Sequence, residues 1–269
     1  MEDKKYYPSI KQAVILLLIA FLIQIIGGII GGIVKGEEFQ NFTELILIIS
    51  FISEIVIIFI GLKKAKTPLK KIFESPKINI KNILCLMVLV VGTWFVMSGL
   101  AAIFINNSQA ARETQERLSS ILFGSSKEWF SILSVIIIAP VLEEIVFRGI
   151  ILQGFLKNYS IKKSVIITAV LFGLFHGNIV QTPIVILLGI VLGIIYIKTS
   201  SLFICIIGHM LNNFIALFGG SVFLLNGRHI YTLIAGIVIV TAAGFIIKNI
   251  PNNIQCLENI MNYKENVEA

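Results

Sequence analysis

The chain has 269 residues, of which 57% are hydrophobic and 14% are charged, and its mean hydropathy is +0.93. Soluble domains carry a charge on about a quarter of their residues, so this composition excludes an ordinary water-soluble protein. A disordered or collagen-like chain would not be this apolar either. The net charge of +7 does not indicate nucleic acid, because Lys and Arg in the cytoplasmic loops of a membrane protein produce the same excess.

Eight apolar segments are long enough, or nearly so, to cross a bilayer, whose hydrocarbon core needs about 20 helical residues. In chain order they are Ala13–Val34, Leu45–Leu62, Ile83–Ile105, Trp129–Phe155, Ser164–Gly177, Pro183–Ile197, Leu202–Gly219 and Ile230–Ile247. The fifth and sixth are short, and we expect them to pack inside the bundle. The sequence therefore predicts an all-α fold, a polytopic membrane bundle of about eight transmembrane helices.

The basic residues predict the orientation of this bundle. Of the 22 Lys and Arg residues, 17 fall on one side of the eight-span topology and 5 on the other. Because basic loops stay in the cytoplasm, we expect a multi-pass protein of the cell membrane with both termini cytoplasmic. The Lys- and Ile-rich composition is typical of a bacterial protein. Residues 106–128 would lie outside, either as an amphipathic helix on the outer surface or as a solvated loop.

Small residues recur at helical spacing in two of the predicted spans. The first span contains Gly27, Gly28, Gly31 and Gly32, and the sixth contains Gly189 and Gly193. Such spacing lets neighbouring helices approach closely in a membrane. We interpret both sets as packing surfaces.

Ionisable groups inside the spans are the place to look for chemistry, because a charge at the bilayer centre costs at least about 2.5–3.5 kcal/mol. The fourth span contains Glu143, Glu144 and Arg148. Residues four apart share a helix face, so Glu144 can pair with Arg148. Glu143 lies about 100° away around the helix, which leaves it available. The alternative is that all three form one structural salt bridge.

Other spans contribute imidazoles and an amide. His176 ends the fifth span, and His209 and Asn213 share a face of the seventh at i, i+4. A helical rise of about 1.5 Å per residue places Glu143, His176, His209 and Asn213 at similar depths, in the middle of the membrane. Glu54 of the second span has no obvious partner in its own helix, and we expect it to serve packing or topology.

These side chains suit hydrolysis of a peptide bond inside the membrane. A carboxylate beside imidazoles can deprotonate water, with or without a metal ion, and imidazole and amide groups can stabilise an oxyanion. The other common protease signatures are missing. The chain has no GxSxG and no HExxH, and its single aspartate, Asp3, excludes an aspartyl dyad.

The residues Glu143-Glu144-x-x-x-Arg148, Phe172-x-x-x-His176 and His209-x-x-x-Asn213 together resemble the three-motif pattern of the CAAX protease and bacteriocin-processing family (CPBP, also called Abi). The resemblance covers about 129–219. It implies three parts of the chain. Residues 1–128 would form the first three spans and the outer segment, 129–219 the catalytic core, and 220–269 the last span and a cytoplasmic tail.

The resemblance also implies roles for the motif residues. Glu143 would be the general base that activates the attacking water, with assistance from His176, while His209 and Asn213 would stabilise the oxyanion. Glu144 and Arg148 would hold the helix in place. The family is described both as metal-dependent and as metal-free, so the cofactor is either none or a divalent ion such as zinc. Glu143, His176 and His209 are the residues that could bind it.

Three functions remain open at this point. The first is an intramembrane endopeptidase that hydrolyses a membrane-associated peptide or protein, with the lipid bilayer as its medium and no nucleic acid as partner. The second is a non-catalytic membrane scaffold or bacteriocin-immunity factor, in which the polar residues serve packing. The third is a transporter that uses the same residues as a proton or substrate path, although no internal repeat of the kind found in transporters is present.

Overall fold

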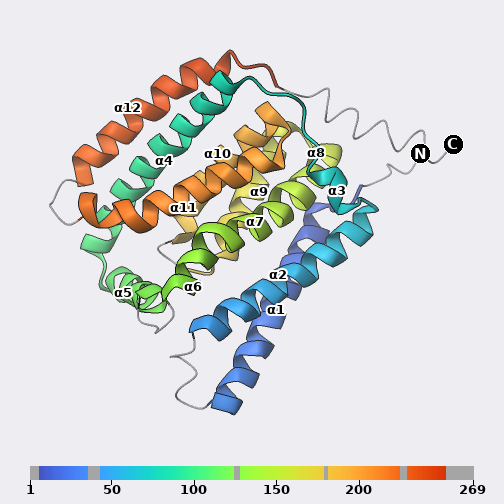
Figure 1. Ribbon diagram of the computed structural model, residues 1–269, viewed down its shortest axis with the longest axis vertical. Coiled ribbons are helices and arrows are strands. Elements are labelled where there is room, and N and C mark those ends of the chain that lie inside the picture. Colours follow the sequence, from blue (N-terminus) through green and yellow to red (C-terminus); the bar gives the residue numbers. More distant parts are fainter. Residues whose placement is uncertain (1–5, 36–42, 124–127, 179–180, 225–228, 253–269) are drawn as a thin grey trace.

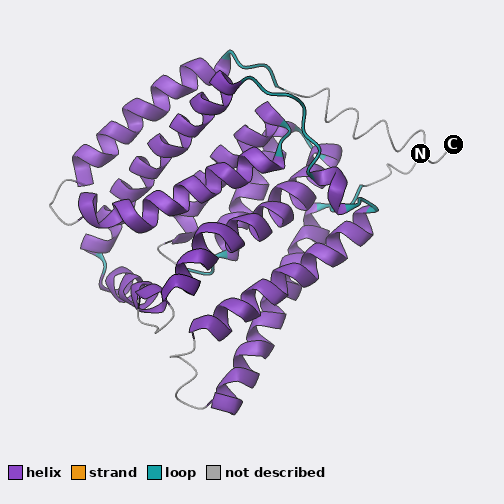
Figure 2. Cartoon of the chain, in the orientation of Figure 1, coloured by secondary structure: helices purple, strands orange, loops and turns teal. Residues whose placement is uncertain are grey.

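The computed structural model describes residues 6–35, 43–123, 128–178, 181–224 and 229–252, and these residues form helices and short connections with no strand (Figure 2). The helices, in chain order, are α1 (Ile10–Lys35), α2 (Thr43–Ala65), α3 (Leu69–Ile72), α4 (Ile80–Asn107), α5 (Gln109–Phe123), α6 (Glu128–Leu133), α7 (Ala139–Glu144), α8 (Gln153–Asn158), α9 (Ile161–Phe175), α10 (Gln181–Thr199), α11 (Leu202–Leu224) and α12 (His229–Lys248). The prediction of an all-α fold is confirmed.

The helices α6, α7 and α8 are parts of one continuous helix over Glu128–Asn158. Two π-helical stretches, Ser134–Ile138 and Ile145–Leu152, connect the three parts. Seven helices in the described residues, this one included, are long and apolar enough to cross a membrane. The remaining predicted span, the fifth, is α9, whose 15 residues rise about 22 Å and fall short of the bilayer core. One face of α9 is packed within the bundle, with Ala169 and Phe172 buried, while Ile166 and Leu174 on the other face are exposed.

The surface of the bundle is apolar, as lipid requires. Large apolar side chains on the outer faces of α1, α2 and α12 are exposed, among them Ile33, Phe59 and Phe245. Charged side chains gather at helix ends instead, for example Lys63 and Lys64 in the last turn of α2. The protein is therefore a multi-pass membrane protein. The helix α5 occupies the segment for which an amphipathic helix was one of the two expectations.

The order of the helices across the bundle decides which side chains can meet. Figure 1 shows α12 and α4 on one flank, α1 and α2 on the other, and the long helix that contains α7 between α2 and α11. Both α2 and α11 contact α7. Side chains of α2, α7 and α11 can therefore converge at one depth, although these helices are far apart in the sequence.

Glycines set the closest approaches between helices. A Cβ atom at Gly189 would lie 2.9 Å from the Ala169 Cα, and one at Gly193 would lie 2.9 Å from the Val165 side chain, so α10 packs directly against α9. In α1, a Cβ at Gly27 would lie 2.7 Å from Ile49 of α2, but nothing lies within 4 Å of one at Gly28 or Gly32. The predicted packing role is thus confirmed for α10 and, in α1, for Gly27 alone among these three.

The start of the chain is fastened to the end of α8. The Asn158 side-chain amide donates to the backbone carbonyls of Tyr6 and Pro8 at 2.7 and 3.3 Å, and its Oδ1 accepts from the Tyr6 N–H at 2.9 Å. The Tyr159 hydroxyl accepts from the Ile10 N–H at 3.3 Å. The first turn of α1 and the end of α8 therefore lie at the same end of the bundle.

The α9–α10 contact predicts a difference between two glycine substitutions. Gly189→Ala should lower the free energy of unfolding by about 1–3 kcal/mol, because the new methyl group meets backbone atoms of α9 that cannot move aside alone. Gly28→Ala adds the same methyl group to open space and should leave stability unchanged or slightly raise it. Thermal denaturation of the two variants in one detergent measures the difference. Equal melting temperatures would contradict the assigned packing.

Candidate active site

The site is built around an ion pair within the long helix. Arg148 Nη1 donates to Glu144 Oε1 at 2.7 Å, and neither side chain is exposed to solvent. Arg148 Nη2 also donates to the carbonyl of Gly189 in α10 at 3.0 Å, and its guanidinium lies over the Phe172 ring at 4.7 Å. The predicted pair is present. Arg148 further connects this helix to α9 and α10, which the i, i+4 spacing could not show.

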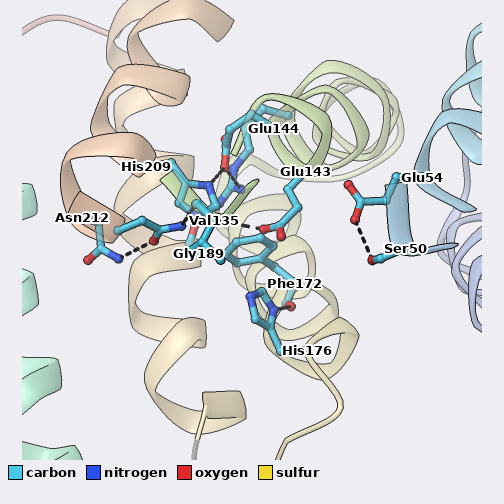
Figure 3. Close-up of polar contacts among 12 residues, drawn as sticks. Ser50, Glu54, Val135, Glu143, Glu144, Phe172, His176, Gly189, His209 and Asn212 are labelled. Atoms are coloured by element: carbon cyan, nitrogen blue, oxygen red, sulfur yellow. Dashed lines mark hydrogen bonds and ion pairs between the residues drawn. The ribbon is translucent and has the colours of Figure 1, made fainter. Parts of the chain in front are cut away.

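His209 of α11 joins this pair from the other side. Its Nδ1 lies 2.9 Å from Glu144 Oε1, and its Nε2 lies 3.9 Å from Glu143 Oε2 (Figure 3). Glu144 is paired with a guanidinium, so its carboxylate accepts, and Nδ1 carries the proton that it donates. The contact fixes the orientation of the imidazole and directs Nε2 towards Glu143.

Glu143 is left without a saturating partner. Its side chain is 12% exposed, and its Oε2 is buried with no hydrogen bond within the described structure. The His209 imidazole, at 3.9 Å from this oxygen, lies beyond hydrogen-bond distance. Two adjacent acids therefore have different environments, as the helical geometry predicts: Glu144 is neutralised, and one oxygen of Glu143 is left without a hydrogen bond in the described structure.

His176 lies at the end of α9, where the chain turns at Gly177 with a φ of +58°. Its Nδ1 lies 3.0 Å from the carbonyl of Phe172. A carbonyl can only accept, so Nδ1 donates, and in the neutral ring Nε2 is the unprotonated nitrogen. This arrangement leaves a basic nitrogen on the side of the ring away from the helix backbone.

The Phe172 ring contacts both histidines. It makes edge-to-face contacts with His176 and His209, with ring centres 5.1 and 5.7 Å apart. The two imidazole centres can be no farther apart than the sum of these distances. His209, which lies near Glu143, and His176 therefore contact the same aromatic ring from α11 and α9.

Asn213 has an engagement that the sequence did not suggest. Its Nδ2 donates to the carbonyl of Val135 at 2.9 Å, and its Oδ1 accepts from Asn212 Nδ2 at 3.1 Å. Val135 lies in the π-helical stretch that precedes Pro140. A π-helical turn widens the helix and is frequent at functional sites. Here it presents a carbonyl to α11 and holds one of the two amide hydrogens of Asn213.

Glu54 of α2 lies at the edge of this group, and its environment corrects one expectation. It is 3% exposed, and the Ser50 hydroxyl, four residues earlier in the same helix, lies 3.5 Å from its Oε1. The expectation that Glu54 has no partner in its own helix is therefore wrong. The other carboxyl oxygen, Oε2, is buried without a hydrogen bond in the described part of the chain.

The donor set was also tested against a metal ion. Within the described residues, no three His, Cys, Asp or Glu side chains lie close enough together to hold one. Glu144 Oε1 and His209 Nδ1 already contact each other, so neither atom is available as a metal ligand. Glu143, His176 and His209 do not fit a three-ligand zinc site in this arrangement, and we derive no step through a metal.

Comparison with known proteins agrees with this site. Residues 125–215 match the family model described as type II CAAX prenyl endopeptidase Rce1-like, and all seven motif residues lie within the match. Searches of curated proteins and of solved structures found no match. The family match confirms the resemblance seen in the motifs and indicates a protease of the CAAX type. Residues 125–215 are therefore similar to the CAAX prenyl endopeptidases, which belong to the CPBP family.

Proposed function

We propose that the protein is an intramembrane endopeptidase in which Glu143 activates the water that attacks the peptide bond. The observation that carries the proposal is the difference between two neighbouring acids. Glu144 is neutralised by Arg148 and His209, while Glu143 has a buried oxygen without a hydrogen bond. Keeping an acid unpaired among apolar helices costs stability. A role as the general base of the reaction explains why this cost is tolerated.

The chemistry can be written with the residues of this chain. Water bound at Glu143 gives a proton to its carboxylate while the water oxygen bonds to the scissile carbonyl carbon. The Nε2 lone pair of His176 can hold the same water in position. The tetrahedral intermediate then collapses, the C–N bond breaks, and the proton held by Glu143 passes to the leaving amine. The carboxylate is regenerated, and no further reactant is consumed.

His209 and Asn213 can stabilise the oxyanion of that intermediate. Because Nδ1 of His209 donates to Glu144, only the doubly protonated ring has an N–H left at Nε2 for substrate. Asn213 keeps a second amide hydrogen besides the one given to Val135.

The substrate that this site suits is a membrane-associated peptide or protein segment that enters the bundle from the cytoplasmic side. Residues 129–219 would be the catalytic core, and the flanking residues 1–128 and 220–269 would enclose it. Both termini would be cytoplasmic. The shared end of α1 and α8 supports this arrangement, since Lys157 and Lys162 lie close to the same end and basic residues favour the cytoplasm.

Loss of Glu143 should abolish processing. In membranes that contain Glu143→Ala or His176→Ala, peptides released by the wild-type protein should be missing, with a loss of at least about a hundredfold for general-base removal. Comparative peptidomics of the membranes measures this. The matched control is Glu113→Gln on α5, an exposed acid, which should behave as wild type. Unchanged peptide release in both site variants would refute the proposal, and a phenotype that survives them would favour a scaffold.

Glu144 and Arg148 should act through stability. Arg148→Met leaves the Glu144 carboxylate buried beside His209 alone, and should lower the free energy of unfolding by about 3–5 kcal/mol. Adding Glu144→Gln to this variant should recover part of the loss, because no unpaired charge then remains. Thermal denaturation in detergent measures both variants, with the exposed Lys162→Met as control. A double variant less stable than Arg148→Met would contradict this assignment.

A further inference from the structure

The family match begins at residue 125. The helix α2 precedes this match in the chain, yet it places an acid, Glu54, beside the site. Figure 3 shows the carboxyl group of Glu54 on the side of α2 that faces Glu143. The helices that carry these two acids, α2 and α7, are in contact. Each group has one oxygen, Oε2, that is buried without a hydrogen bond in the described structure.

Among the described residues, no salt bridge joins Glu54 to a cationic side chain. The helices packed against α2 are α1, α6, α7 and the π-helical stretch Ile145–Leu152. Near its middle α1 offers the neutral Gln24, which donates to Ser53 at 3.0 Å. The π-helical stretch offers Arg148, which is engaged by Glu144 and the Gly189 carbonyl. Glu128 begins α6, and α7 carries Glu143 and Glu144.

The charges of the site therefore leave an excess of one negative group. Glu144 is balanced by Arg148, and a protonated His209 would balance Glu143, so an ionised Glu54 would stand without a partner. A single uncompensated charge costs several kcal/mol inside a membrane. Two neighbouring carboxyl groups can relieve the cost by sharing one proton, directly or through a water molecule, because one group then donates and the other accepts.

We propose that Glu54 is a positioning residue of the active site, which holds the Glu143 carboxylate by sharing one proton with it, directly or through one water. The inference rests on the proposed function for its kinetic consequence, but not for the shared proton itself. Ser50 orients the Glu54 carboxyl from the far side through Oε1. Glu143 is then held between α2 and α11, with His209 on one side and Glu54 on the other.

Two substitutions separate positioning from packing. Glu54→Leu keeps bulk and removes the hydrogen bond, so kcat should fall about tenfold or more with KM nearly unchanged, as expected for a lost hydrogen bond to a charged group. Glu54→Gln keeps a donor for Glu143 and should recover much of that loss. Glu44→Gln, an acid in the first turn of the same helix, should match wild type. A kcat in Glu54→Leu equal to that of wild type would overturn the proposal.

Infrared spectroscopy of the purified protein tests the shared proton without any substrate. The C=O band of a protonated carboxyl group should be present in the wild type at neutral pH, absent in Glu54→Gln, and shifted in Glu143→Gln, which changes its acceptor. A band that Glu143→Gln leaves unchanged, or no such band in the wild type, would overturn the inference. A wild type with the band and its shift but no peptidase activity would instead reject the proposed function alone.

Discussion

The ion pair between Glu144 and Arg148 is the interaction on which the rest of the site depends. Both groups are fully buried, where either charge alone would cost several kcal/mol. Together they use their remaining hydrogen-bond capacity on other helices. Arg148 reaches α10 through the Gly189 carbonyl, and Glu144 reaches α11 through His209. The pair thus neutralises both charges and also connects the long helix to α10 and α11.

Much of the fold follows from hydropathy and length, because the bilayer demands long apolar helices and tolerates few charges. The predicted fourth span Trp129–Phe155, for example, differs by only a few residues from the helix at Glu128–Asn158. The pairing of Glu144 with Arg148 is likewise local, and helical spacing suffices to predict it. Depth along each helix also predicts that His176, His209 and Glu143 lie at one level, and the structure places His209 near Glu143.

The remaining features depend on tertiary contacts that no local pattern encodes. The contact between His209 and Glu144 joins residues 65 positions apart, and which face of α11 meets α7 is decided by packing across the bundle. The π-helical stretches on either side of α7 had one local signal, Pro140, which cannot donate a hydrogen bond to the preceding turn. Glu54 had none, because the chain order of α2 and α7 does not show that these helices are neighbours.

The amide of Asn158, which holds Tyr6 and Pro8, limits how the α1–α2 hairpin can move. Sliding of α1 along the long helix would break these bonds, whereas a swing about this end would keep them. Such a swing would move the far end of α1, where Gly28 and Gly32 face open space, by the largest amount. The hydrogen bonds of Asn158 thus fix the position of α1 along the long helix at one end only.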